Sequence, residues 1–292
     1  MFCKNCGNEL KNDIKFCTNC GNTISVIKKE GLKSLLTRRR VFLIVSILIV
    51  LSLIVFFYFS FKNPNISTDK RNQDIASTVV NIYCMGETEE EDSGGSGTIL
   101  TEDGLVLTNA HIIPTGSDGT VSCLVVLPEP ITGAPDEIYY GYPIIVPELS
   151  EQYDLAFIQI DDVYIDEDGV VYGDYPKTFP AYNSDKYCKN EKIKLGEPVK
   201  VYGYPAISGG YALTVTDGIV SSFLIDEGLI VTSAKISPGN SGGLAVDGNG
   251  CSIGIPSMYM SDEAESLGFI ISNDLIYDFI DELISYMDLN NL

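Results

Sequence analysis

The sequence predicts an all-β domain with one C-terminal helix, preceded by a membrane-spanning helix and a small cysteine-rich module. Three observations lead to this prediction. Short β-type runs alternate with turn residues from about residue 75 onward, residues 41–59 are uncharged and mostly apolar, and the first 21 residues hold two Cys-x-x-Cys-Gly units. A chain of 292 residues, 45% of them hydrophobic, is long enough for one domain of ordinary size plus smaller accessories.

The cysteine-rich module is an internal repeat, because FCKNCG at residues 2–7 recurs fourteen residues later as FCTNCG. Each unit directs two thiols to one side of a tight turn, and glycine supplies a conformation that a Cβ would oppose. Four thiolates close a tetrahedral Zn²⁺ shell, which is typical of structural zinc. Two disulfides or a redox pair are the alternative. The segment resembles the zinc ribbons at the N-termini of many bacterial membrane proteins. We expect residues 1–24 to form a zinc ribbon with the ligands Cys3, Cys6, Cys17 and Cys20.

The apolar segment predicts one transmembrane helix over residues 41–60. Nineteen uncharged residues at about 1.5 Å each span about 28 Å, close to the hydrocarbon thickness of a bilayer. The preceding segment, 25–40, is basic and ends in three arginines, and basic flanks favour the cytoplasmic side. We therefore expect a single-pass protein of the cell membrane, with a cytoplasmic N-terminus and an extracytoplasmic main domain. A cleaved signal peptide is less favoured, because forty residues precede the apolar run.

This topology separates the two sets of cysteines. The ribbon would lie in a reducing compartment, where thiolates persist as ligands. The remaining four cysteines would lie outside, where disulfides are permitted, and the sequence leaves their pairing open. These residues are Cys84, Cys123, Cys188 and Cys251.

The main domain is expected over residues 75–292, after a polar linker at 61–74. Residues 274–289 repeat apolar side chains at helical spacing, with Ser272 or Asn273 as the N-cap. Two stretches rich in Pro, Gly, Asp and Tyr, 128–150 and 161–180, read as surface loops. The predicted β runs are STVVNIYCM, SGTILT, GLVLTNA, TVSCLVVLP, DLAFIQI, EPVKVYGYP, GYALTVTDGIVSSFLI, GLIVTSAKI and CSIGIPSMYM.

Charge excludes one class of function for this domain. Residues 1–40 carry a net charge of +6, whereas the other 252 residues carry −27. Binding to nucleic acid needs a basic surface that neutralises phosphates, so we do not expect a nucleic-acid partner.

A serine hydrolase is the chemistry that the remaining polar residues favour. His111, the only histidine, follows a β run, and Ser241 lies in PGNSGG at 238–243, where glycines permit a sharp turn. A structural histidine and a flexible turn are the alternative interpretations of these two residues. The motif also fits the Gly-x-Ser-x-Gly elbow of α/β-hydrolases, but that class places its histidine after the serine. Asp154, at the start of a buried-looking strand, is the candidate that orients the histidine, and the amides of Gly239 and Ser241 are the candidate oxyanion hole.

The chain resembles the HtrA/DegP-type trypsin-like serine proteases through six blocks in family order. The resemblance implies a chymotrypsin-like double β-barrel of six strands each, with peptide bonds as substrate. At the matching positions it implies His111 as base, Asp154 as orienting acid and Ser241 as nucleophile. The blocks are SGGSGTIL (93–100), DGLVLTNAH (103–111), DLA (154–156), TDGIVS (216–221), GNSGG (239–243) and GFII (268–271).

Two departures from that family affect the expected function. The family often carries PDZ domains after the protease, and we expect none here. Lys235 precedes Ser241 by six residues, at the base of the primary specificity pocket of such folds. It would favour an acidic or polar P1 residue, unless its amine extends into solvent.

The expected function is a membrane-anchored serine endopeptidase that cleaves extracytoplasmic proteins, with protein quality control as its setting. Its expected partners are polypeptide substrates, the lipid bilayer and a cytoplasmic partner of the ribbon, and the resemblance leaves a homo-oligomer open. A catalytically idle protease fold that serves as a membrane sensor or scaffold is the competing function. A third is that the ribbon is the main module and the outer domain senses.

Overall fold

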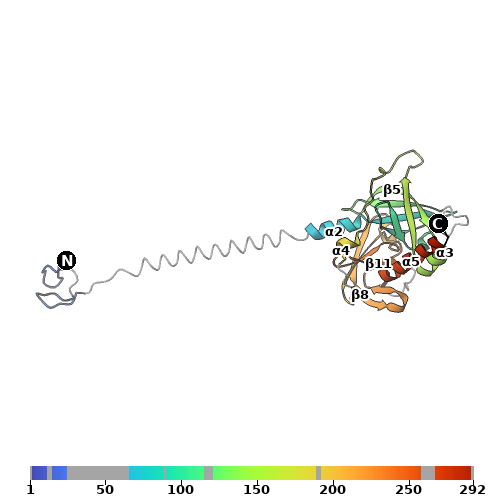
Figure 1. Cartoon of the computed structure of the whole chain (residues 1–292). Coiled ribbons are helices and arrows are strands. Elements are labelled where there is room, and N and C mark those ends of the chain that lie inside the picture. Colours follow the sequence, from blue (N-terminus) through green and yellow to red (C-terminus); the bar gives the residue numbers. More distant parts are fainter. Residues whose placement is uncertain are drawn as a thin grey trace. The chain divides into compact units, whose positions relative to one another are not determined.

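The computed structural model of the chain divides into two compact units, Met1–Asn65 and Ile66–Leu292, which are described separately (Figure 1). The predicted basic segment 25–40 and transmembrane helix 41–60 lie outside the described residues and stay predictions. In the part of the chain that is described, no helix is long and apolar enough to cross a membrane. The described residues are 2–11, 15–24, 66–88, 90–114, 121–188, 192–257 and 267–290.

The first unit contains two cysteine turns with the same geometry. The N–H of Gly7 donates to the carbonyl of Cys3, and the N–H of Gly21 donates to that of Cys17, both at 2.8 Å. Both glycines have positive φ, 70° and 67°, which confirms the conformational reason for glycine after each cysteine pair. Leu10, which is buried, packs with the cysteines as a small core.

The second unit contains two closed antiparallel barrels of six strands each, which confirms the double barrel that the family resemblance implies. The first barrel closes in the order β1-β2-β3-β6-β5-β4, and the second repeats this order six strands later, as β7-β8-β9-β12-β11-β10. The strands of the first barrel are β1 (Val79–Met85), β2 (Ser93–Ile99), β3 (Leu105–Thr108), β4 (Ser122–Pro128), β5 (Pro135–Ile144) and β6 (Ala156–Val163). Those of the second are β7 (Pro198–Gly203), β8 (Thr214–Leu224), β9 (Leu229–Thr232), β10 (Leu244–Asp247), β11 (Ser252–Ser257) and β12 (Gly268–Ser272).

Each barrel encloses its own apolar core, because alternate residues of each strand point inward. The first core includes Val80, Ile99 and Ile158, and the second includes Val201, Val220 and Ile270. A third cluster joins the barrels to the C-terminal helix. Short 3₁₀ turns connect several strands: η1 (Ala110–Ile112), η2 (Ala206–Ser208) and η3 (Ile225–Glu227).

The prediction of a surface loop over residues 128–150 is wrong for most of that range. It contains β5 and the short helix α3 (Pro147–Tyr153). Prolines and a glycine hide the alternation of β5, yet its Tyr139 is fully buried in the first barrel. Helix α3 begins with proline at its first turn, followed by Glu148, which are residues that favour a helix start. The four-residue β10, which directly follows the glycines near Ser241, also carries too little pattern to be recognised.

Residues 66–74 fall in the predicted linker, but they belong to helix α2 (Ile66–Ala76). The helix is stabilised by tertiary contacts that no local pattern reveals. The guanidinium of Arg71 donates to the carbonyls of Asn249 at 3.0 Å and Gly248 at 3.2 Å. Asp74 forms an ion pair at 2.6 Å with Lys186, in the short helix α4 (Ser184–Tyr187).

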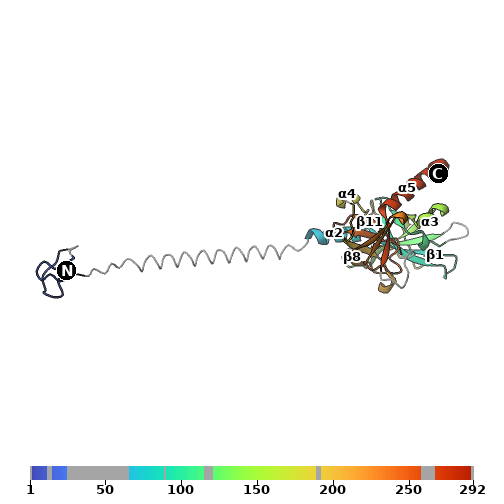
Figure 2. The same ribbon diagram turned by 90° about the horizontal axis from the view of Figure 1, so that it is seen from below.

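The C-terminal helix α5 (Asn273–Asn290) confirms the predicted amphipathic helix to within a residue at each end. The Ser272 hydroxyl accepts the N–H of Leu275 at 3.4 Å. In Figure 1, α5 lies beside α3, where Phe279 packs against Tyr153 with ring centroids 5.7 Å apart. Figure 2 shows the C-terminal part of α5 extending away from the barrels. The helix thus braces α3, which leads directly to Asp154.

The four cysteines outside the ribbon form two disulfides. Cys84 and Cys123 are opposite residues of the paired strands β1 and β4, and both are fully buried. Cys188, after α4, is bonded to Cys251, between β10 and β11. The pairing that the sequence left open is therefore one bridge inside the first barrel and one on the second barrel.

Candidate active site

His111 lies in the η1 turn that follows β3, so a rigid strand of the first barrel positions it. The turn is fixed from the other side, because the N–H of Ala110 donates to the carbonyl of Asp154 at 3.2 Å. The His111 side chain is 28% exposed. It is therefore held at its base, and its side chain is partly exposed.

Asp154 has an unusual backbone conformation. It caps the C-terminus of α3 in the left-handed region, with φ 53°, and is the only described non-glycine residue with positive φ. Aspartate and asparagine tolerate this region better than other residues with a Cβ. The sequence predicts Asp154 at the start of a strand, and the structure shows that it is also the C-cap of helix α3.

The Asp154 carboxylate contacts His111 twice. Its oxygens lie 2.8 and 2.9 Å from the ring Nδ1, and Oδ1 accepts the backbone N–H of His111 at 3.1 Å. A carboxylate beside Nδ1 selects the tautomer in which Nδ1 carries the proton. The other nitrogen, Nε2, then carries the lone pair that can accept a proton from a nucleophile.

Two further donors hold the same carboxylate. The amide of Asn109 donates to Oδ2 at 3.0 Å and to the Asp154 carbonyl at 2.8 Å, and the hydroxyl of Ser257 donates to Oδ2 at 3.0 Å. Asn109 comes from the first barrel and Ser257 from the end of β11 in the second. Sequence reasoning did not identify Ser257, which lies in an unremarkable β run. Only the closure of the two barrels brings it to Asp154.

Ser241 lies on the loop between β9 and β10 and is 3% exposed. Its carbonyl accepts the N–H of Ser96 at 2.8 Å, which attaches the loop to β2 of the first barrel. Gly242 has φ 82°, and a Cβ there would lie 2.1 Å from the Ser96 carbonyl and 2.4 Å from the Thr108 hydroxyl. Glycine is required at 242, because the Ser241 loop packs directly on the segment that precedes His111.

The peptide unit before Gly239 is oriented by a neighbouring loop. The carbonyl of Pro238 accepts the N–H of Ala206 at 2.8 Å. Because C=O and N–H of a trans peptide point in opposite directions, the N–H of Gly239 points away from Ala206. Within the described chain, this N–H makes no hydrogen bond. It is thus free to donate to an external acceptor, as an oxyanion hole requires.

Lys235 lies at the surface, in the loop that leads to Ser241. Its carbonyl accepts the hydroxyl of Thr216 at 2.8 Å, and no described residue forms an ion pair with its amine. The structure brings His111 and Asp154 into contact and places the Ser241 loop against the same strands, while it leaves the specificity role of Lys235 a prediction.

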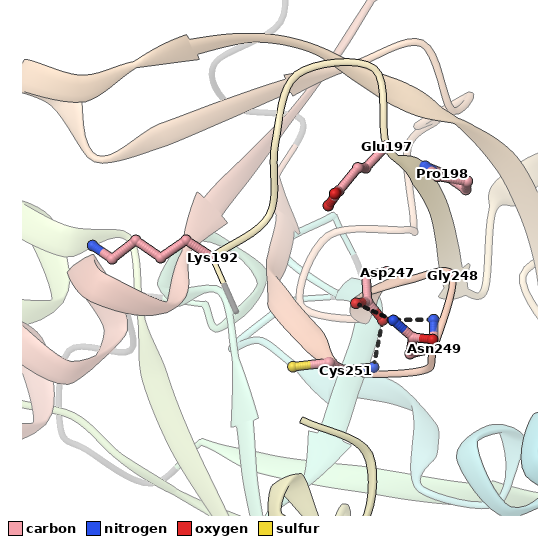
Figure 3. Close-up of a pocket in the computed structure, with 7 residues that line it drawn as sticks. All are labelled: Lys192, Glu197, Pro198, Asp247, Gly248, Asn249 and Cys251. Atoms are coloured by element: carbon pink, nitrogen blue, oxygen red, sulfur yellow. Dashed lines mark hydrogen bonds between the residues drawn. The ribbon is translucent and has the colours of Figure 1, made fainter. Parts of the chain in front are cut away.

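A separate pocket of about 330 Å³ lies on the second barrel beside the turn that joins β10 to β11 (Figure 3). Its Asp247 accepts the backbone N–H groups of Asn249 and Cys251, both at 2.8 Å. This carboxylate therefore shapes the turn. None of the predicted catalytic residues lines the pocket, and we assign it no role in the reaction.

The ribbon cysteines fit a tetrahedral metal site. Their four sulfur atoms lie within 4.8 Å of one another. The sulfur atoms of Cys3 and Cys20 are 3.7 Å apart, and those of Cys6 and Cys17 are 3.6 Å apart. Each pair joins a cysteine of the first turn to one of the second. Zinc–sulfur bonds of about 2.3 Å in a tetrahedron place sulfurs about 3.8 Å apart, whereas a disulfide needs about 2.05 Å. The spacing therefore suits structural zinc and disagrees with two disulfides.

Hydrogen bonds within the ribbon already favour a thiolate. The backbone N–H of Asn22, followed by the Cys6 thiol, lowers the pKa of Cys20 to about 6. At Cys6 the N–H of Asn8 also acts to lower the pKa, but Cys20 and burial outweigh it and raise the pKa to about 11. The hydrogen bonds thus favour a thiolate at Cys20 and a thiol at Cys6, and a bound cation would favour ionisation of both.

Comparison with known proteins gives two matching families. Residues 95–255 match the trypsin-like peptidase domain, and residues 2–24 match the zinc-ribbon domain.

Individual relatives agree with the first match. The chain is 29% identical over 216 residues to the serine protease Do-like HtrA of Bacillus subtilis, covering 68% of this chain and 41% of that protein. It is 28% identical over 201 residues to the mitochondrial protease Do-like 4 of Arabidopsis thaliana, covering 65% and 32%. A crystal structure of a serine endoprotease from Yersinia pestis matches with a TM-score of 0.56 and 26% identity, covering 76% of this chain and 68% of that one. The chain thus spans less than half the length of these two curated relatives.

Proposed function

The chain belongs to the trypsin-like peptidase family, and we propose that it is a serine endopeptidase in which Ser241, His111 and Asp154 form the catalytic triad. The observation that carries the proposal is the pair of hydrogen bonds from His111, through its ring Nδ1 and its backbone N–H, to the Asp154 carboxylate. A structural histidine needs only one hydrogen-bond partner for each ring N–H. Here four donors from two barrels converge on the single carboxylate that faces Nδ1.

In the proposed reaction, the Ser241 hydroxyl attacks the carbonyl carbon of the scissile peptide while His111 Nε2 takes its proton. The carbonyl oxygen becomes an oxyanion, which accepts the N–H groups of Gly239 and Ser241. His111 returns the proton to the leaving amine, which breaks the C–N bond and leaves an acyl-enzyme. Water, deprotonated by the same histidine, then releases the acyl group and restores Ser241. The Asp154 carboxylate stabilises the imidazolium that forms in both steps.

The proposed substrates are extracytoplasmic polypeptides, cleaved by a domain anchored through residues 41–60. The two states of cysteine support this placement. The barrel cysteines are paired in disulfides, which persist in oxidising compartments, whereas the ribbon cysteines are separate. A membrane that separates an oxidising compartment from a reducing one would explain both the disulfides of the barrels and the separate thiols of the ribbon. Protein quality control, which the family resemblance suggests, is the proposed setting, and a homo-oligomer is compatible with it.

The zinc ribbon at 2–24 would hold one structural Zn²⁺ through Cys3, Cys6, Cys17 and Cys20. No open coordination position would remain, so we propose no catalytic part for the metal. Its proposed role is to keep a small folded module ready for a cytoplasmic partner.

Covalent labelling by a fluorophosphonate, with hydrolysis of an unfolded protein as a second measurement, tests the peptidase proposal on the purified full-length chain. We expect labelling and hydrolysis by the wild type, and neither by Ser241→Ala or His111→Ala. Because no second histidine exists, activity that survives in His111→Ala would overturn the mechanism. A folded wild type that neither labels nor cleaves would favour the idle scaffold instead.

A further inference from the structure

Ser96, in β2 of the first barrel, is fully buried and lies outside the proposed triad. It nevertheless has four hydrogen bonds around the nucleophile loop. Its backbone N–H donates to the Ser241 carbonyl at 2.8 Å, and its carbonyl accepts the Thr108 hydroxyl at 2.7 Å. Its own hydroxyl donates to the Gly239 carbonyl at 2.6 Å and accepts the Tyr204 N–H at 2.9 Å.

The hydroxyl of Ser96 completes the second of two connections between two loops of the second barrel. The first connection is direct, from the Ala206 N–H to the Pro238 carbonyl. The second passes through Ser96, from the Tyr204 N–H to the hydroxyl and on to the Gly239 carbonyl. The two connections fix the peptide units on either side of Gly239. Glycine has φ 95° there and would otherwise rotate easily.

The second barrel leaves space for this side chain. A Cβ at Gly203 would lie 3.0 Å from the Ser96 hydroxyl, and a Cβ at Gly242 would lie 2.1 Å from its carbonyl. The hydroxyl therefore lies against the backbone at Gly203, where a Cβ would press on it. A buried hydroxyl with both a donor and an acceptor bond has one defined orientation, which suits it to fixing a loop.

We propose that Ser96 is a positioning residue for the oxyanion hole: its hydroxyl fixes the Gly239 peptide and so makes transition-state binding depend on correct docking of the two barrels. This inference rests on the proposed peptidase function. Loss of the hydroxyl would leave the Gly239 carbonyl without its donor, and only the Ala206–Pro238 bond would then restrain the peptide that carries the Gly239 N–H. The ground-state contacts of the substrate would change little, so the effect falls on kcat.

Ser96→Ala in the full-length chain tests the inference, with Thr98→Val as its matched control. Thr98 lies two residues along the same strand and is also buried, and its hydroxyl has no hydrogen-bond partner among the described residues. We expect kcat to fall about 10²-fold in Ser96→Ala with KM nearly unchanged, as for loss of one oxyanion donor. Binding of a peptide boronate, which forms a tetrahedral adduct, should weaken in parallel. Thr98→Val should match the wild type in both.

Hydrogen–deuterium exchange of peptides that cover residues 236–243 gives a readout that needs no turnover. We expect faster exchange there in Ser96→Ala and unchanged exchange in Thr98→Val. If Ser96→Ala does not fold, Ser96→Cys keeps the shape with a weaker donor and should show the same changes at smaller size. A folded Ser96 variant with wild-type kcat and wild-type exchange overturns the inference. A wild type without peptidase activity would refute the proposed function, while the exchange data would still decide whether Ser96 fixes the loop.

Discussion

The Asp154 carboxylate binds both the ring Nδ1 and the backbone N–H of His111, at 2.8 and 3.1 Å. It therefore fixes the position of the residue as well as the orientation of its ring. Different substitutions of Asp154 should distinguish its effect on the His111 ring from its effect on the backbone.

Asp154→Asn should lower kcat about 10⁴-fold and leave the fold intact. Asparagine tolerates the left-handed backbone at this position, but its amide would stabilise the imidazole tautomer with the proton on Nε2. Asp154→Ala should lose the same activity and also unfold at lower temperature, because alanine in this conformation costs about 1–2 kcal/mol. Steady-state kinetics and thermal unfolding of both variants measure this. Equal melting temperatures for the two variants would contradict the backbone argument.

Ser257→Ala should lower kcat about tenfold, which corresponds to about 1.4 kcal/mol. The variant removes one donor to the carboxylate, whereas the Asn109 amide and the His111 N–H remain. Hydrogen bonds to charged groups contribute about 1.5–3 kcal/mol, so a partial loss of this size is expected. Ser252→Ala, on the same strand β11, is the control, because its hydroxyl contacts Asn273 instead of the site. A full loss of activity in Ser257→Ala would mean that Ser257 acts on substrate directly.

These two predictions mark where sequence reasoning succeeds and where it ends. The short motifs around His111, Asp154 and Ser241 carry chemistry in local spacing, and their order along the chain made the three residues identifiable together. Ser96 lies in one of the family blocks and Ser257 in none, but no spacing indicates the role of either, since their roles arise only when strands of different barrels meet. The fold behaves in the same way. Most strands were predictable from apolar runs, whereas β5 was hidden by its prolines and α2 depends on the contacts of Arg71 with a distant turn.

Lys235→Ala should abolish a preference for acidic or polar P1 residues. A peptide library measures this preference, with wild type and variant compared at equal concentrations of fluorophosphonate-reactive enzyme. The exposed amine has no ion-pair partner among the described residues, so it is available to a substrate carboxylate. Lys235→Arg is the matched variant and should keep the preference. A preference for small aliphatic P1 residues that stays the same in Lys235→Ala would show that the amine only extends into solvent.

Cys17→Ser should remove zinc from the full-length chain, measured as bound metal per chain by mass spectrometry. The wild type should hold one zinc, since the sulfurs form a single tetrahedral cluster. Thr18→Ser, in the same turn but without a ligand atom, is the control and should keep its metal. We expect peptidase activity of the Cys17→Ser chain to stay within about twofold, because a closed structural site contributes to the fold of its own module. A large loss of activity would mean that the ribbon supports the protease.

Mild reduction should open the Cys188–Cys251 bridge before the Cys84–Cys123 bridge. Thiol exchange needs access of the attacking thiolate to sulfur. Cys84 and Cys123 are fully buried, whereas Cys188 and Cys251 are half-buried. Differential alkylation followed by peptide mass spectrometry gives the order. The buried bridge also joins two neighbouring strands of the barrel around His111, so its loss should lower stability by about 2–4 kcal/mol. If Cys84→Ser with Cys123→Ser unfolds no more easily than the wild type, hydrogen bonding between β1 and β4 is sufficient to close the first barrel and the bridge is dispensable.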